Sequence, residues 1–383
     1  MKKNLITLAL LAACGAATAQ SSVTLFGVVD ATVRYVDAGS NGNLWQLTNS
    51  GMAGSRLGFR GTEDLGGGLN ASFWLEAGIN NDNGTGVASN LNNAANSGAS
   101  STGTQGLTFN RRSTVSLAGS WGELRIGRDY VPSFWNVAIF DPFGSQGVGT
   151  NAIFNYAGLA MLTGGTLNVT NAGIRASNSI GYLLPKMGGF YGQAMLAMGE
   201  QSTKSAGTTT CPASPSAAGT SNACKSNGNV ASVRVGYASG PFDASYSWGG
   251  TTFAPSEQYV QQNLGASWNF GVAKLMGLWN QEKALSKTAN SYTLGATMPI
   301  GVAELKAAYT WGSSTNDGLD GNMIAVGGVY NLSKRTALYT TYSHISNSGN
   351  KATYNYGLAG LPMVVPSLGS STWGLDIGVR HVF

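Results

Sequence analysis

The feature that most limits what this chain can fold into is an alternation of apolar and polar residues with a period of two. In the stretch 23–35, one set of positions carries Val23, Leu25, Val29, Val33 and Tyr35, and the intervening set includes Thr24, Asp30, Thr32 and Arg34. The same pattern recurs at 69–79, 242–248, 260–268 and 373–379. A side-chain period of two is the period of a β-strand. The sequence therefore predicts one all-β domain, with no helical region and no linker.

The first 19 residues have the three parts of an export signal. Two lysines begin it, residues 5–13 form its apolar core, and small residues at 17–19 provide a cleavage site before Gln20. We therefore expect residues 1–19 to be removed and residues 20–383 to form the mature domain. Removal of the two lysines lowers the formal net charge from +5 to +3, which does not suggest a nucleic-acid-binding protein.

Three cysteines are present in the sequence. Cys14 lies in "LAAC", which resembles a lipoprotein processing site, although a small residue inside a cleaved signal is the simpler interpretation. Cys211 and Cys224 lie in a polar stretch rich in Ser, Thr, Ala and Gly. Because an exported chain meets an oxidising compartment, we expect these two cysteines to form a disulfide that closes one long loop. Only two histidines occur and neither is near, so we expect no metal site.

The connections between the predicted strands alternate in length. The short ones are 64–68, 119–122, 184–189, 239–242, 269–271, 299–301 and 331–334. Longer polar stretches lie near 37–54, 80–106, 131–173, 200–228, 250–258, 283–290, 313–321 and 346–371. The strands between them number sixteen, an even number, and short turns at one rim with long loops at the other are typical of an up-and-down transmembrane β-barrel. A soluble β-sandwich is the alternative, but it would not need this regular asymmetry.

The membrane imposes closure on such a sheet. No run of about 18 apolar residues follows the export signal, so we expect no transmembrane helix. A strand in lipid must satisfy all its backbone hydrogen-bonding groups, so the sheet must close on itself. We therefore expect the terminal stretch 373–383 to pair antiparallel with 21–30. Sixteen strands would enclose a water-filled lumen. Aromatic residues typical of membrane interfaces occur at the strand ends, namely Trp45, Trp121, Trp248, Trp279, Trp311, Tyr330 and Trp373.

Several longer motifs resemble the general porins of Gram-negative outer membranes, especially the beta-proteobacterial type. They are "SSVTLFGVVDATVRY", "GSRLGFRGTEDLGGGLNASFWLE", "WGELRIGRDY", "FDPFG", "NLSKRTALYTTYSHISN" and the terminal "GVRHVF". The resemblance implies a homotrimer of 16-stranded antiparallel barrels in the cell outer membrane. It also implies that the third long loop, about 131–173, folds inward, and that Phe383 belongs to a signal read by the barrel insertion machinery.

The same resemblance implies the partners of the chain. They are small hydrophilic solutes and inorganic ions in the channel, with outer-membrane lipid and lipopolysaccharide around the barrel. No cofactor and no nucleic acid is expected.

Charged side chains at the narrowest ring set the selectivity of such a channel. Lumen-facing parity and the family pattern together predict a basic wall made of Arg34, Arg56, Arg60, Arg112 and Arg175. The third loop carries "DPFG" at 141–144, which looks like the tip motif of the family, but its only acid is Asp141, with Asp129 just before the loop. Because the acidic half of the ring is thin, we expect a weak to moderate preference for anions.

Two other functions are set against passive diffusion. A channel that prefers sugars would need a row of aromatic residues in the lumen, and among the aromatic residues only Phe26 and Trp74 occupy strand positions that face the lumen. A patch of arginines would instead favour small organic anions. An enzyme built on a barrel would need a base beside a nucleophile. The only histidines are His344 and His381, and neither G-x-S-x-G nor H-E-x-x-H occurs, so we expect no catalytic residues.

Overall fold

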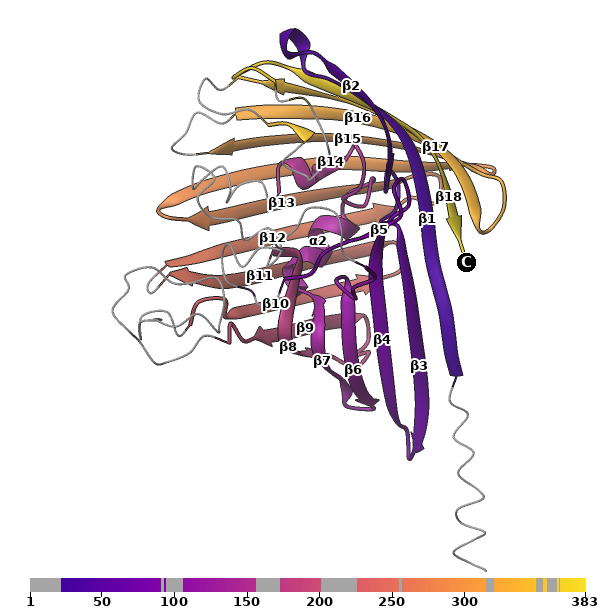
Figure 1. Ribbon diagram of the computed structural model, residues 1–383. Coiled ribbons are helices and arrows are strands. Elements are labelled where there is room, and N and C mark those ends of the chain that lie inside the picture. The colour runs from indigo at the N-terminus through magenta and orange to yellow at the C-terminus, as the bar shows by residue number, and fades with distance from the viewer. Residues whose placement is uncertain are drawn as a thin grey trace, which may run out of the picture.

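The computed structural model of the chain describes residues 22–90, 93, 106–155, 173–200, 226–254, 257–314, 320–348, 354–356, 364 and 366–383. These residues form a closed antiparallel β-barrel of 16 strands, as predicted from the sequence (Figure 1). Two of the strand segments, β2 and β3, are halves of one barrel strand, because both pair with β1. The short segment β5 only extends the edge of β4.

The strand segments follow one another along the chain. Their bounds are β1 (Ser22–Asp37), β2 (Asn43–Asn49), β3 (Arg56–Gly66), β4 (Leu69–Asn80), β5 (Thr85–Gly86), β6 (Arg112–Gly119), β7 (Gly122–Tyr130), β8 (Arg175–Leu183), β9 (Phe190–Ala197), β10 (Val230–Ser239), β11 (Phe242–Ala254), β12 (Glu257–Asn269), β13 (Lys274–Ala284), β14 (Lys287–Ile300), β15 (Ala303–Ser314), β16 (Asp320–Asn331), β17 (Thr336–Asn347) and β18 (Thr372–Val382). The described helices are η1 (Gly39–Asn41), α2 (Pro132–Ile139) and η2 (Asn151–Ile153), and none of these is long or apolar enough to cross a membrane.

The barrel closes where β1 meets β18, but in a different register from the one expected. Residues 28–37 of β1, and not 21–30, lie opposite 373–382, and Gly27 exchanges backbone hydrogen bonds of 3.0 and 3.1 Å with Phe383. Residues 22–28 pair with β3 on the other edge of β1. The difference arises because closing a barrel requires a stagger between its strands, so the first and last strands do not meet end to end.

The stretch 37–54 was expected to be one long loop, but it contains the strand β2. Here Trp45 and Leu47 are exposed while Thr48 is buried, so the strand alternation continues. The strand breaks at residues 50–55, where the carboxylate of Asp30 accepts hydrogen bonds from the backbone N–H groups of Met52 (3.0 Å) and Ala53 (2.8 Å). These bonds supply partners to backbone groups that leave the ladder.

The two faces of the sheet differ as the alternation predicts. On β6, Val115 and Leu117 are exposed on the outer surface, whereas Thr114 and Ser116 are buried on the inner side. The outer face is therefore apolar, which suits lipid, and the inner face is polar, which suits a water-filled lumen.

The third long loop folds into the barrel and begins with a helix, so the expectation of no helical region was wrong. Pro132 occupies the first turn of α2, where its missing N–H costs no hydrogen bond. Two hydrogen bonds attach the helix to strands β10 and β11. The backbone N–H of Ser133 donates to Ser232 Oγ (3.1 Å), and Asn136 Nδ2 donates to the carbonyl of Ser245 (3.0 Å). Figure 1 shows α2 within the ring of strands.

The buried apolar core lies between this loop and the inner wall. Its largest cluster joins Phe143, Val148, Ile153 and Phe154 of the loop to wall residues such as Met323 and Ile345, and to Tyr354 and Tyr356. The third loop is therefore a packed element with its own apolar contacts, which hold it across the channel.

Candidate functional site

A cavity of about 400 Å³ lies between the inner wall formed by β3, β4, β6 and β7 and the inner side of the third loop. This volume falls within the range of small-molecule sites. The wall contributes Arg56, Trp74, Glu76, Arg111, Arg112, Asp129 and Tyr130. The loop contributes Phe134, Trp135, Ala138, Gly144 and Gln146. The cavity therefore lies between the inner wall and the third loop, at the depth of the barrel where the loop folds inward.

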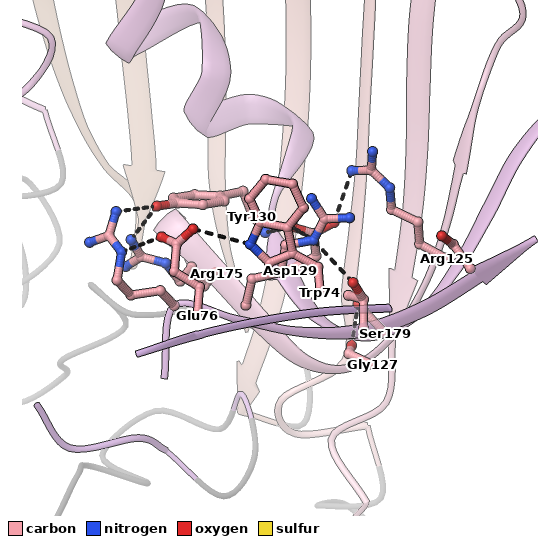
Figure 2. A network of polar contacts seen from close by, with 12 residues as sticks. Trp74, Glu76, Arg125, Gly127, Asp129, Tyr130, Arg175 and Ser179 are labelled. Carbon is pink, nitrogen blue, oxygen red and sulfur yellow. Dashed lines mark hydrogen bonds and ion pairs between the residues drawn. The ribbon is translucent and has the colours of Figure 1, made fainter. Parts of the chain in front are cut away.

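Glu76 is the centre of one group of polar contacts on this wall (Figure 2). Its Oε1 forms an ion pair with Arg111 Nε at 2.5 Å and lies 3.7 Å from Arg56 Nε. Its Oε2 accepts a hydrogen bond from Trp74 Nε1 at 3.2 Å. The side chain of Glu76 is buried, and the neighbouring guanidinium groups of Arg111 and Arg56 compensate its negative charge.

The hydroxyl of Tyr130 accepts hydrogen bonds from two arginines (Figure 2). The donors are Nη2 of Arg111 at 2.8 Å and Nη2 of Arg175 at 2.6 Å. The guanidinium of Arg175 also lies 4.2 Å from the centre of the Tyr130 ring. The Tyr130 ring in turn stacks on Phe134 of α2, with centroids 5.1 Å apart. Tyr130 therefore connects the arginines of the wall to the loop.

Asp129 is the centre of a second group of charges on the wall. Its Oδ2 forms an ion pair with Arg125 Nη1 at 3.1 Å, and its Oδ1 lies 3.7 Å from Arg112 Nε. Arg125 is also paired with Glu123 at 2.6 Å. Arg112 donates from Nε to Thr114 Oγ1 at 3.0 Å, and its guanidinium lies 4.7 Å from the centre of the Trp74 ring.

The charges of this wall do not cancel. The two groups and the adjacent Arg60 comprise six arginines and three carboxylates, namely Arg56, Arg60, Arg111, Arg112, Arg125, Arg175, Glu76, Glu123 and Asp129. The excess of positive charge lies around the cavity, and a cleft lined mainly by one sign of charge concentrates ions of the opposite sign.

The chain matches the family model of Gram-negative porins over residues 7–350. It belongs to that family. The outer membrane porin protein 32 of Delftia acidovorans is 39% identical over 393 residues, with 100% of both chains covered. An outer membrane porin protein of Bordetella pertussis is 30% identical, with 91% of this chain and 95% of the relative covered. The chain is therefore a porin of the outer membrane, and porins are channel proteins, not enzymes.

Solved structures agree with this placement. The anion-selective porin from Comamonas acidovorans superposes with a TM-score of 0.76 at 36% identity, covering 95% of this chain and 100% of that one. OmpT of Vibrio cholerae gives a TM-score of 0.61 at 12% identity, covering 95% of this chain and 98% of that one, and so shows the fold alone.

Among the arginines expected on the basic wall of this porin, the structure brings three together. Arg56 and Arg112 line the cavity, and Arg175 contacts Tyr130 beside it. Arg60 lies next to this group, with its guanidinium 5.1 Å from the ring of Trp74 and 5.4 Å from that of Phe26.

Arg34 lies elsewhere, because its charge is already paired. Its side chain is fully buried and binds Asp376 directly across the seam, with Nε–Oδ1 at 2.6 Å and Nη2–Oδ2 at 2.8 Å. The third loop covers this pair, since the backbone N–H of Val148 donates to Asp376 Oδ2 at 3.0 Å. Arg34 therefore presents no charge to the cavity.

Asp141 and Asp129 were expected on the loop side of the ring, but neither exposes its carboxylate on the loop surface that faces the cavity. The carboxylate of Asp141 is buried and accepts hydrogen bonds from the backbone N–H groups of Phe143 (2.9 Å), Ser145 (3.1 Å) and Asn151 (3.1 Å). This burial raises the pKa of Asp141 to about 6. Asp129 is part of the wall strand β7, where it pairs with arginines. The loop side of the cavity is accordingly without an exposed acid among the described residues.

Sequence reasoning missed several residues of the site. Glu76 shares lumen parity with Trp74, which was a usable signal, but Arg111 precedes β6 and has no strand parity to place it. Phe134 and Trp135 lie in a helix that the strand pattern does not predict. Cys211 and Cys224 lie outside the described residues, so their disulfide stays a prediction.

Proposed function

We propose that this porin is a water-filled channel for the passive diffusion of small hydrophilic solutes and inorganic ions, with a weak to moderate preference for anions. The observation that carries the proposal is the unequal charge of the constriction, where six arginines stand beside three carboxylates. The relative from Comamonas acidovorans, described as an anion-selective porin, supports the same selectivity.

Selectivity would arise mainly from Arg56 and Arg112. Both line the cavity, and each lies 3.7 Å from a carboxylate that a second arginine holds more closely. Their charges are therefore only partly compensated. A unit charge at about 4 Å in water-like surroundings is worth about 1 kcal/mol, which corresponds to roughly fivefold in local anion concentration.

Planar-bilayer recording tests the proposal through the reversal potential in a salt gradient. We expect the wild-type channel to pass chloride in preference to potassium. The Arg56→Gln and Arg112→Gln variants should each lower the anion-to-cation permeability ratio, by up to about fivefold. Arg335→Gln is the matched control, because it removes the same charge from an exposed turn and should leave the ratio unchanged. A wild-type channel that prefers potassium would overturn the proposal.

The second candidate function is a channel that prefers particular small organic anions or sugars. The arginine cluster favours the organic anions of this pair, because guanidinium groups bind carboxylates. Saturable block of the ionic current by one solute would support this candidate over unselective diffusion.

Assembly and targeting complete the proposal. Residues 1–19 would direct export and be removed, and three copies of the mature chain would assemble into a homotrimer within the lipid and lipopolysaccharide of the outer membrane. Phe383 would act in the signal recognised by the barrel insertion machinery. Closure of the reconstituted channel in three equal steps would support three pores per assembly.

A further inference from the structure

The third loop faces the arginine wall with aromatic side chains. Phe134 and Trp135 of α2 both line the cavity. The ring of Tyr130 lies 5.1 Å from each of them, measured between centroids. The side of the constriction opposite the arginines therefore offers ring faces and ring edges, and not carboxylates.

Besides Tyr130, the wall contributes the ring of Trp74. Trp74 lines the same cavity, and its indole lies 4.9 Å from the ring of Phe26. The guanidinium groups of Arg60 and Arg112 lie 5.1 and 4.7 Å from the Trp74 ring. Flat apolar surface and positive charge thus alternate within the reach of one small molecule.

We propose that this cavity is a binding site for aromatic carboxylates. The carboxylate of such a solute would bind to Arg56 and Arg112, and its ring would pack against Trp135 and Trp74. This inference rests on the proposed function, because it names the solute class that the anion-selective constriction holds most strongly.

The arginines retain hydrogen-bonding capacity for such a solute. Within the part of the chain that the structure describes, the guanidinium of Arg112 forms one hydrogen bond, through Nε to Thr114. Arg56 forms one as well, through Nη1 to the carbonyl of Gly54 at 2.8 Å. Terminal amino groups of both side chains are left for a carboxylate, which a guanidinium can bind through two parallel hydrogen bonds.

The rings distinguish this class from other anions. Chloride, phosphate or a short aliphatic acid would use the arginines but would make no ring contact with Trp74 or Trp135. Offset or edge-to-face contact between rings is favourable beyond the area that it buries. An aromatic acid should therefore bind about 3- to 10-fold more tightly than a saturated acid of the same charge and similar size.

The test is block of the chloride current through single channels in a planar bilayer. Benzoate and cyclohexanecarboxylate are added separately at constant chloride, because both carry one carboxylate on a six-membered ring and only benzoate is aromatic. We expect the half-blocking concentration of benzoate to be about 3- to 10-fold lower. Trp135→Leu should bring the two half-blocking concentrations within about twofold of each other. Trp121→Leu is the matched control, because Trp121 is 43% exposed on a turn outside the cavity, and should keep the full ratio.

The outcomes separate this inference from the proposed function. Equal block by the two acids in a wild-type channel that still prefers anions would overturn the binding site and leave the proposed function standing. A wild-type preference for cations would overturn both. If Trp135→Leu keeps the preference for benzoate, the binding site does not lie in this cavity. If that variant does not fold, the comparison of benzoate with cyclohexanecarboxylate in the wild-type channel still tests whether a site for aromatic acids exists.

Discussion

The ion pair between Arg34 and Asp376 should hold the barrel seam closed. Both side chains are 0% exposed, and they join the first strand to the last through two hydrogen bonds of 2.6 and 2.8 Å. Asp376→Asn keeps the size of the side chain and removes its charge, which leaves the guanidinium of Arg34 buried without a counter-charge. Removing one partner of a buried pair costs about 3–5 kcal/mol. We therefore expect the free energy of unfolding to fall by about that amount.

Urea-induced unfolding in detergent micelles, followed by tryptophan fluorescence, measures this change. Glu304→Gln is the matched control, because Glu304 pairs with Lys306 at 3.3 Å but its side chain is 38% exposed. Because water reaches Glu304 and screens its charge, this pair contributes less than about 1 kcal/mol, so the control should unfold almost as the wild type does. The double variant Arg34→Met/Asp376→Leu should recover most of the loss, because no charge is then left buried.

Two results would contradict this reasoning. If Asp376→Asn is no less stable than Glu304→Gln, the pair does not stabilise the seam. If the double variant is as unstable as Asp376→Asn, the loss comes from packing and not from an uncompensated charge. Asp376→Asn should also give a noisier open-channel current, since Val148 of the third loop donates its backbone hydrogen bond to the same carboxylate.

Three further predictions concern other parts of the chain. The pKa of Asp141 rises from 3.8 to about 6 in the folded protein, so the stability that its protonation contributes is fully present below about pH 4 and is lost as the pH rises through 6. In urea unfolding, the free energy of unfolding of the wild type should increase by on the order of 2 kcal/mol relative to Asp141→Asn when the pH is lowered from 7.5 to 4. A difference between the two proteins that stays constant with pH would refute this linkage. Deleting Phe383 should abolish insertion, seen as loss of folded protein in isolated outer membranes, without altering the selectivity of any channels that form. Cys211 and Cys224 should resist thiol labelling of the denatured protein until it is reduced, and labelling without reductant would refute the disulfide.

The barrel could be predicted because the alternation of residues within each strand determines which face of the sheet is apolar. The period of two places Val115 outside and Thr114 inside without any knowledge of neighbouring strands, and the alternating connection lengths suggest the number of strands. The lumen parity of Arg56 and Arg112 likewise placed both on the wall beside the cavity.

Residues whose surroundings depend on distant partners could not be placed in this way. Arg34 has the same parity as Arg56, but the stagger of the seam sets it opposite Asp376, and the loop covers the pair. Asp141 was expected to face the wall because it is the one acid in the loop sequence. Instead, the turn that follows it directs two backbone N–H groups at its carboxylate, and the start of η2 adds a third from Asn151. Parity describes which face a side chain lies on, and it does not reveal what covers that face.

The burial of Asp141 also explains how the two halves of the constriction differ. Its carboxylate is used to order the loop tip, so the loop reaches across the channel without exposing a negative charge there. The surface that does face the wall is the side of α2 that carries Phe134 and Trp135, and Tyr130 binds this side of the helix to two arginines. Aromatic rings tolerate nearby guanidinium groups, because the ring face attracts a cation without neutralising its charge. The wall can therefore be held in place by the loop while its arginines stay positive toward the solute, which an acidic loop could not achieve.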